Sequence, residues 1–432
     1  MATVTGEESL ELPYCGEEER SDPHTMATVT CQSPELPQDI LIDIFSRLQI
    51  PDLAPAGSVS SSWRSAYTSL LNLGKYYRQA QTPCLLYTCE CAGKNVACLY
   101  SLAEKRVYKL PLTWSLLRGR FVIGSSLGVL VTVDERSEMH LVNPITGEQI
   151  GLPSVTTIEQ VKPIYDDTGA LHMYECSFHT AKKVLCPPEI VALDKLRDFL
   201  QHKAFVLSDT STKSLIVVLI HNPHRQLSFA RLGDDSWTWL PPHAFFDDCI
   251  YKDGLLYATN TDGEIHAFDL SGPKVTCKMI LRRFEVEKCR SMYIVQAPWG
   301  DLLQVGRSFS DYELEPEPGA FVYWNTGRFR IYKVGIAGKG REKVRSLGDH
   351  VLFLGYNQSL CLSAKEYPGL KANHAYFTDE SYLWTKGFEN NRRDQGRSSP
   401  LGKVWQLPYL DFGQKLKYIY AYMNIQSVLY SF

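Results

Sequence analysis

The sequence predicts an α+β multidomain protein, in which a small N-terminal module of three helices precedes an all-β propeller of about six or seven blades. Two observations lead to this fold class. Apolar residues recur at helical spacing between residues 36 and 75, and from residue 83 onward short β-branched and aromatic runs alternate with turn residues. The length of 432 residues also favours two unequal units over one compact domain.

Residues 1–35 are expected to form a disordered acidic tail. They hold eight acidic residues against the single Arg20 and show no apolar period. The rest of the chain carries a net charge of about +4. Nucleic-acid binders usually present a strongly basic face, so we expect no nucleic-acid partner. The run from Met1 to Thr5 recurs from Met26 to Thr30, which leaves either methionine as a candidate start of translation.

The composition is that of a protein of the cytoplasm, the nucleus or both. No segment offers the roughly 18 unbroken apolar residues of a membrane helix, and the N-terminus lacks a basic region followed by an apolar stretch. We therefore expect no membrane partner. The twelve cysteines are scattered through apolar, strand-like contexts, which favours reduced, buried thiols over a disulfide framework.

The helical module is predicted to begin at Leu36-Pro37, because proline suits a first helical turn where its missing N–H has no partner. One apolar stripe then follows at helical spacing, which indicates an amphipathic helix of about three turns. The stripe is formed by Ile40, Leu41, Ile44, Phe45 and Leu48.

Two further short helices are predicted in this module. Asp52 can cap a helix that holds Leu53, and Ser60 or Ser61 can cap a third helix in which Trp63 and later apolar residues recur at helical spacing. Three helices in about 40 residues bury too little surface to be robust alone. We expect them to dock on a partner, the alternative being a helical cap packed on the larger domain. Residues 76–82 are the expected linker, and residues 83–432 the larger domain.

Four segments of the module resemble the F-box: LPQDIL at 36–41, IFSRL at 44–48, PDL at 51–53 and VSSSWR at 59–64. The resemblance implies that residues 36–75 bind the Skp-type adaptor of a cullin ubiquitin ligase. Two positions depart from the usual pattern, because Pro55 replaces a common basic residue and Ser60 a common cysteine. The residues that would make or support the contact are Leu36, Pro37, Ile40, Leu41, Ile44, Phe45, Leu48, Leu53, Val59 and Trp63.

A weak internal repeat predicts the blades of the larger domain. A turn residue opens an apolar strand, a polar turn follows, and a second strand alternates apolar and polar residues, as in 128–141 and 254–268. Corresponding openings near 128, 214, 254, 300 and 350 are 86, 40, 46 and 50 residues apart. Blades of 40 to 50 residues therefore fit, with one insertion and a short helix expected within 155–200. A pair of β-sandwiches is the alternative.

This domain also resembles the propeller of an uncharacterised family of plant F-box proteins. The resemblance rests on GSSLGVLVTVD at 124–134 and LVNPITGE at 141–148, and on SLGD at 346–349, FLGY at 353–356 and YFTDE at 376–380. With the F-box it covers about residues 36–394. Beyond residue 394 the pattern stops, so the sequence does not identify the strand that closes the ring; 405–410 is predicted to be a strand outside the pattern.

No catalytic or cofactor motif stands out. The segment GIAGKG at 335–340 lacks the spacing and the final Ser or Thr of a phosphate loop and is predicted to be a surface turn. The sets Cys84, Cys89, Cys91, Cys98 and His172, Cys176, His179, Cys186 fit zinc spacing poorly. Acidic pairs at 234–235 and 247–248 are predicted to lie in solvated turns. We expect no cofactor, no metal and no catalytic residue.

Two functions remain open from the sequence. The first is a non-catalytic substrate-recognition subunit of a Skp-cullin-F-box ubiquitin ligase, in which the propeller holds a protein substrate. The alternative is a propeller enzyme, such as a glycosidase or an oxidoreductase, with an incidental helical cap. Loops on propeller faces determine the ligand, and the fold alone does not predict it.

Overall fold

The fold was analysed in a computed structural model of the whole chain. The expected tail at 1–35 and the expected linker at 76–82 lie outside the described residues. The structure describes residues 36–48, 52–53, 56–72, 83–89, 96–101, 105–110, 117–144, 147–178, 187–209, 214–272, 274–283, 289–310, 322–323, 325–335, 340–367, 369–377, 392–393, 405–406 and 416–423.

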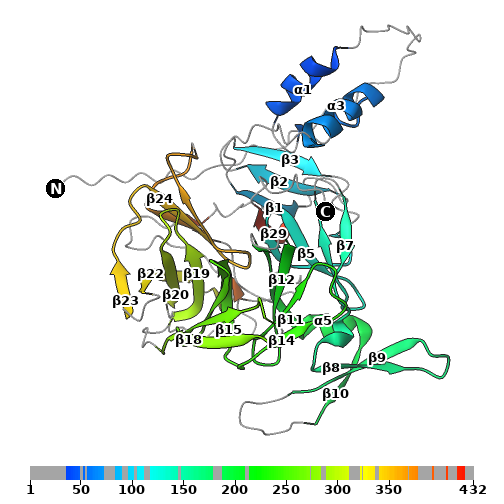
Figure 1. The fold of residues 1–432 in the computed structure, drawn as a ribbon, viewed down its shortest axis with the longest axis vertical. Helices are drawn as coiled ribbons and strands as arrows, with labels where there is room; N and C mark the ends of the chain where they lie inside the picture. The colour runs from blue at the N-terminus through cyan, green and yellow to red at the C-terminus, as the bar shows by residue number, and fades with distance from the viewer. Residues whose placement is uncertain are drawn as a thin grey trace.

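Two helices dominate the N-terminal module, α1 (Gln38–Ser46) and α3 (Ser61–Asn72). Between them Asp52, Leu53 and Ala56 are also helical, as predicted for the second helix. Ser60 caps α3, because its Oγ accepts a hydrogen bond from the Trp63 amide at 3.2 Å. Figure 1 shows the module projecting from the larger domain beside β3 (Arg106–Leu110).

The larger domain is a six-bladed propeller, since the described residues form six four-stranded sheets. In sheet order, the first three blades are β29 (Leu416–Met423), β1 (Cys84–Cys89), β2 (Ala97–Ser101), β3; then β4 (Phe121–Ser126), β5 (Val129–Val133), β6 (Met139–Val142), β7 (Gln149–Gly151); then β11 (Gln201–Asp209), β12 (Ser214–His221), β13 (Gln226–Arg231), β14 (Thr238–Leu240).

The last three blades complete the ring (Figure 1). They are β15 (Phe246–Lys252), β16 (Leu255–Asn260), β17 (Ile265–Asp269), β18 (Thr276–Leu281); then β19 (Cys289–Gln296), β20 (Leu302–Ser310), β22 (Asn325–Gly335), β23 (Gly340–Val344); then β25 (Leu360–Ser363), β24 (His350–Leu354), β26 (His374–Phe377), β28 (Trp405–Gln406). The first strand of each sheet lies innermost, because these strands contact one another around the ring.

The predicted repeat corresponds to the second strand of each blade. The openings near 128, 214, 254, 300 and 350 precede or begin β5, β12, β16, β20 and β24. The long spacing holds an insertion between the second and third blades, made of η2 (Val155–Thr157), β8 (Val161–Tyr165), β9 (Leu171–Cys176), β10 (Glu189–Ala192) and α5 (Leu193–Phe199). The short helix was predicted, whereas the three-stranded sheet was not.

The C-terminal strand closes the ring. β29 lies antiparallel to β1 with Cys84 opposite Met423, so the first blade takes its innermost strand from the end of the chain. The sixth blade departs from a simple meander, because β24 runs parallel to β26 and β26 parallel to β28. A two-stranded sheet of β21 (Val322–Tyr323) and β27 (Arg392–Arg393) lies apart from the blades. Of the predicted strand at 405–410, only β28 lies within the described residues.

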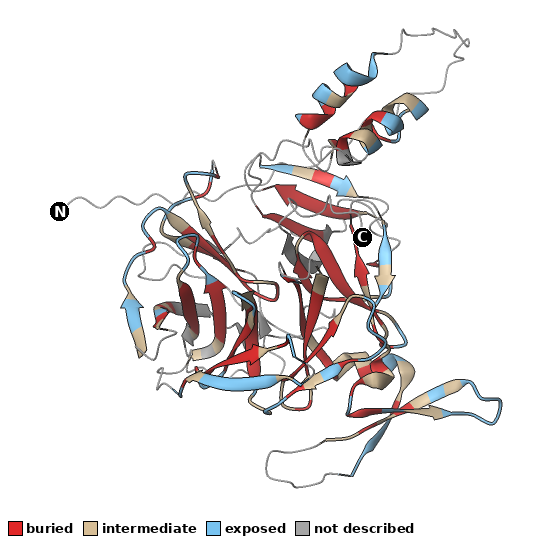
Figure 2. Cartoon of the chain, viewed as in Figure 1, coloured by how far each residue is buried: buried red, intermediate tan, exposed pale blue. Residues whose placement is uncertain are grey.

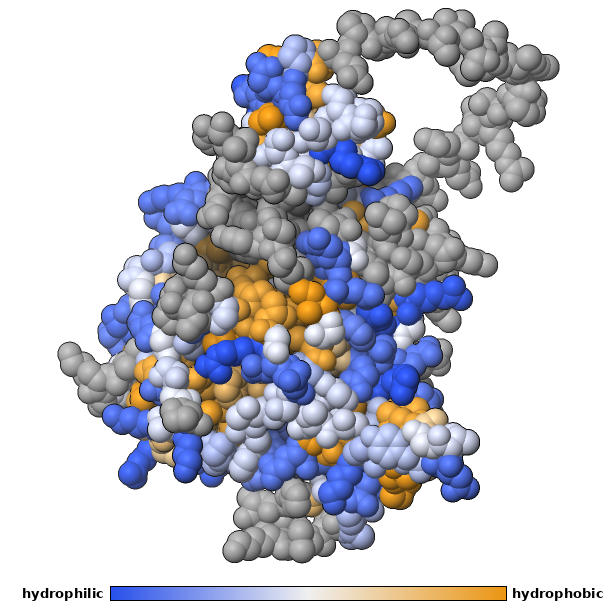
Figure 3. All heavy atoms as spheres, turned by 45° about the vertical axis from the view of Figure 1, so that its right-hand side comes forward, coloured by the Kyte–Doolittle hydropathy of each residue, from blue (hydrophilic) through white to orange (hydrophobic). Residues whose placement is uncertain are grey.

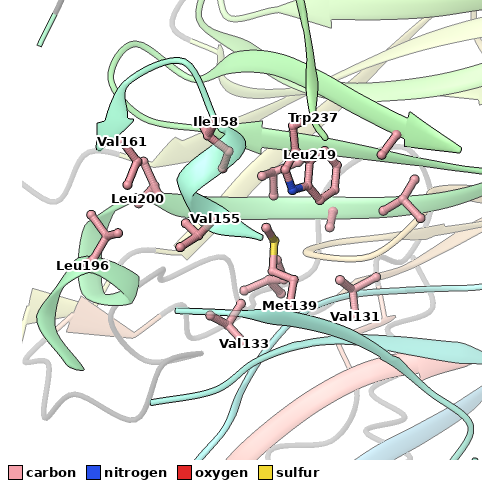
Figure 4. Packing of buried hydrophobic residues seen from close by; sticks show 14 of the residues in the cluster. Val131, Val133, Met139, Val155, Ile158, Val161, Leu196, Leu200, Leu219 and Trp237 are labelled. Carbon is pink, nitrogen blue, oxygen red and sulfur yellow. The ribbon is translucent and has the colours of Figure 1, made fainter. Parts of the chain in front are cut away.

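Burial follows the radial order of the strands. Figure 2 shows buried residues along the inner strands and exposed ones on outer strands such as β18 and β23. The insertion is tied to the ring by its apolar inner face. Figure 4 shows Val155, Ile158 and Val161 beside Leu200 and Trp237, which joins the insertion to the third blade in one core. The sheet of the insertion is therefore held rigidly on the propeller.

Candidate functional site

The apolar stripe of α1 consists of two rows with different surroundings. Leu41 and Phe45 are 1% and 0% exposed, whereas Ile40 and Ile44 are 45% and 41% exposed. Residues four apart lie above one another on a helix, and adjacent residues lie about 100° apart around the axis. One row therefore faces α3 and the other faces solvent.

The buried row builds the module's own core. Phe45 and the Trp63 ring meet edge to face with centroids 5.3 Å apart. Leu41, Leu53 and Leu70 complete the core from the three helical segments. These side chains stabilise the module and fix the position of its surface residues.

The exposed row belongs to a larger apolar surface, which we call the docking face: Leu36, Pro37, Ile40, Ile44 and Val59. Leu36 and Val59 are 47% and 65% exposed, and Pro37 is exposed as well. Four of the nine large apolar side chains exposed among the described residues lie here. Figure 3 shows apolar residues at the surface of the module, next to polar ones. Such a concentration in so small a module is typical of a surface that binds another protein.

The ten residues predicted from the F-box resemblance thus divide by burial. Leu36, Pro37, Ile40, Ile44 and Val59 are accessible to a partner, Leu48 and Trp63 are half-buried, and Leu41, Phe45 and Leu53 lie in the core. Direct contact by the exposed residues and indirect support by the buried ones stay predictions. Pro55 lies outside the described residues.

A polar contact links the module to the first blade. The Arg106 guanidinium on β3 lies 3.4 Å from the Asp52 carboxylate, with both side chains partly exposed. Exposed ion pairs contribute little to stability. The docking face carries neither residue, so this link leaves that face accessible.

The centre of the propeller is occupied by its own chain. The connection between β24 and β25, residues 355–359, is buried except for Gln358, which is half-buried. The Tyr356 hydroxyl lies 3.1 Å from Nδ1 of His202 on β11, and the Gln358 amide donates to the Ser125 carbonyl on β4 at 3.4 Å. The connection therefore joins the sixth blade to the second and third across the axis.

A buried ion pair lies beneath this connection. Lys203 Nζ on β11 is 3.1 Å from Asp248 Oδ1 on β15 and donates to the Gly355 carbonyl at 3.1 Å. Asp248 Oδ2 accepts hydrogen bonds from Ser359 Oγ at 2.7 Å and from the Ile294 amide at 3.0 Å. Burial raises the pKa of the Asp248 carboxyl, and Lys203 and Ser359 oppose that shift. Four blades thus share one polar network.

The prediction that Asp247 and Asp248 lie in a solvated turn is wrong. Both are buried in β15, at a bulge in its pairing with β16. Asp247 accepts from Arg225 and from the Met292 amide, whereas Asp248 binds Lys203. The carboxylates are satisfied by different partners, which is how a protein tolerates buried acids. The pair at 234–235 is exposed, as predicted.

The other segments considered for chemistry have structural surroundings. Gly335 and Gly340 form the last pair of the β22–β23 ladder, so the GIAGKG segment is a hairpin connection. Among the described residues, no three His, Cys, Asp or Glu side chains are placed to share a metal ion. The described cysteines are free thiols, and five of the seven are buried as predicted. Cys277 is exposed, which the sequence pattern did not indicate.

No helix among the described residues is long and apolar enough to cross a membrane. The described chain is therefore defined by two parts, a helical module with an exposed apolar face and a six-bladed propeller. Fold and site together are those of an F-box protein with a propeller domain.

Comparison with known families agrees on both parts. The family model for the KIB1-4 beta-propeller matches residues 99–399, and the F-box-like model matches residues 33–71. The chain belongs to the KIB1-4 β-propeller family. The resemblance to plant F-box proteins with a propeller is thereby confirmed.

Several relatives are F-box proteins of Arabidopsis thaliana. F-box protein KIB4 is 23% identical, covering 85% of this chain and 87% of the relative. F-box protein At5g25290 is 24% identical, covering 85% and 89%. Among solved structures, apo AztD from Citrobacter koseri aligns over 63% of this chain and 71% of its own, with 10% identity and a TM-score of 0.29. That score is too low to support an argument.

Proposed function

We propose that this chain is the substrate-recognition subunit of a Skp-cullin-F-box ubiquitin ligase. The docking face binds the Skp-type adaptor, and through it the cullin, while the propeller holds a protein target. The chain itself performs no chemistry. It accelerates ubiquitin transfer by holding the target near the ubiquitin-loaded enzyme, which raises the effective concentration of the reacting groups.

The observation that carries this proposal is the division of α1 into a buried row and an exposed row. An isolated helical cap would turn its large apolar residues toward its own domain. Here Ile40 and Ile44 stay exposed although Leu41 and Phe45 beside them are fully buried. A second protein that covers the exposed row would remove this apolar surface from water and gain about 25 cal/mol for each Å².

The filled centre of the propeller also favours an adaptor. Residues 355–359 and the Lys203–Asp248 pair occupy the axis, where a propeller with a central ligand would need room. The target is therefore held by the rims and outer surfaces of the blades. We further propose that the domain boundaries are those expected from the sequence, 36–75 and 83–432, and that the protein acts in the cytoplasm, the nucleus or both.

The test separates docking from folding. Ile44→Asp places a charge on the docking face, and we expect at least about tenfold weaker binding of purified Skp-type adaptor with an unchanged melting temperature. Leu41→Ala removes a core side chain, and we expect weaker binding only because the module loses about 2–5 kcal/mol of stability. Binding is measured by titration and unfolding by circular dichroism.

A matched control is Ile190→Asp on β10, because Ile190 is also an exposed apolar residue, at 57%, but lies in the insertion. It should leave adaptor binding unchanged. Equal affinity of the wild type and Ile44→Asp for the adaptor would refute the proposed docking face.

A further inference from the structure

The outer half of the fourth blade places three soft or nitrogen donors on one face. Cys277 Sγ on β18 lies 3.8 Å from Nδ1 of His266 on β17. Met279 stands directly opposite His266 in the strand pairing. Cys277 and Met279 are two residues apart on a strand, so their side chains leave the same face of the sheet. A thiol, an imidazole and a thioether therefore share one face.

The imidazole is held in place by its surroundings. The Phe246 ring meets it edge to face at 5.4 Å, and the Phe268 ring stacks on it at 6.4 Å. Glu264 Oε2 lies 3.5 Å from Nε2 of His266 and is itself fixed by Asn260 Nδ2 at 2.8 Å. A carboxylate beside Nε2 favours the tautomer that carries its proton there. The lone pair of Nδ1 then points toward the thiol.

The site is open on one side only. His266 is 3% exposed and Met279 is 45% exposed, and Cys277 is also exposed. Glu264, which contacts Nε2 on the far side of the ring, corresponds to the outer carboxylate that orients many metal-bound histidines. An ion from solvent can reach Sγ, while the ring behind it stays fixed.

We propose that Cys277, His266 and Met279 bind a soft monovalent cation of the Cu(I) type. A sulfur and a nitrogen 3.8 Å apart can each lie about 2.0 to 2.3 Å from one shared ion. Thiolate and thioether ligands select Cu(I), whereas structural zinc requires four ligands from Cys, His or carboxylates. This site is independent of the docking face and adds a ligand to the proposed adaptor role.

Binding is a simple exchange of a proton for the cation. Burial raises the pKa of the Cys277 thiol, so the free protein holds the S–H proton at neutral pH. The cation takes the sulfur lone pair, the proton leaves to solvent, and no electron is transferred. Thiolate and Cu(I) neutralise each other, which suits a half-buried position.

The experiment titrates the reduced full-length protein with Cu(I) alone, anaerobically, against a chromogenic Cu(I) chelator. The wild type should hold one equivalent more than Cys277→Ser. His266→Gln and Met279→Leu should each weaken that equivalent about tenfold or more. Cys289→Ser is the matched control, since Cys289 is half-buried and contacts Arg330 instead of a histidine. It should behave as the wild type.

Two results would overturn the site. One is equal Cu(I) content and affinity in the wild type and Cys277→Ser. The other is a Zn(II) titration in which this equivalent binds zinc as tightly as Cu(I), because the soft-donor assignment would then fail. If His266→Gln does not fold by circular dichroism, Cys277→Ser and Met279→Leu decide the question, since both alter exposed side chains.

Discussion

At the scale of single residues, the centre of the propeller depends on Lys203 and Asp248. Their side chains are 4% and 0% exposed. The ammonium also lies 4.9 Å from the Phe205 ring centre. A buried charge costs several kcal/mol unless its partner remains, so the two residues have to be considered as one unit.

Lys203→Met should destabilise the propeller by about 3–5 kcal/mol, because it leaves Asp248 without a counter-ion. Adding Asp248→Asn removes the stranded charge but keeps oxygen and nitrogen for hydrogen bonds. We expect the double variant to recover part of the loss. Urea denaturation of the wild type and the three variants measures the coupling. Strict additivity of the two single changes would contradict it.

His221 should make stability fall in mild acid. It is fully buried, its Nε2 lies 2.8 Å from Ser228 Oγ, and burial lowers its pKa to about 4. The unfolded chain takes up the proton near pH 6.5, so it binds more protons than the native state between pH 6.5 and 4. Stability is therefore full above pH 6.5 and about 2 kcal/mol lower at pH 5.

Urea denaturation at pH 7 and pH 5 measures this loss. His221→Gln cannot titrate and should show a pH dependence smaller by that amount, whatever its absolute stability. An identical pH dependence in both proteins would show that His221 is not the group responsible.

At the scale of elements, the β24–β25 connection determines how the blades meet at the axis. It replaces the open centre of a ring by contacts from Tyr356, Gln358 and Ser359 to the second, third and fourth blades. The close approach of the inner strands is also set by Gly124, whose added Cβ would lie 1.9 Å from the Ala204 carbonyl oxygen. Only glycine fits between β4 and β11 here.

Removing the contacts of this connection should loosen the inner strands without unfolding the blades. In the variant Tyr356→Ala/Ser359→Ala we expect hydrogen exchange of β11 and β15 amides to accelerate at least about tenfold, because two hydrogen bonds across the axis are lost. Mass spectrometry of exchanged peptides measures it. The outer strand β18 serves as the internal control, and acceleration there to the same extent would indicate general destabilisation instead.

At the scale of the whole molecule, the ring is held closed by the two ends of the propeller chain. β29 supplies the innermost strand of the first blade and also contacts β4 of the second. A chain that ends at Lys415 should leave β1 with a free edge and melt roughly 5–10 °C lower. A chain that ends at Gln426 keeps β29 whole and should melt as the wild type does. Thermal unfolding of both variants decides between these outcomes.

The sequence was sufficient where the pattern is local. Helical spacing located Leu41, Phe45 and Trp63, and the turn at 261–263 located the β16–β17 hairpin. It was not sufficient for Asp248, because neighbouring residues in sequence do not reveal that Lys203 lies opposite. A clue was available, since Asp247 and Asp248 interrupt an apolar, aromatic run, which is unusual for a solvated turn.

The sequence by itself determined the two-part organisation, the F-box and the blade repeat, because periodicity and spaced motifs are properties of short segments. Only the tertiary structure decided the blade count, the closure by β29, the filled axis, and which apolar residues of α1 face solvent. Each of these depends on residues far apart in the chain meeting at one place. Burial, ion pairing and ring closure are set by those encounters, and no local pattern encodes them.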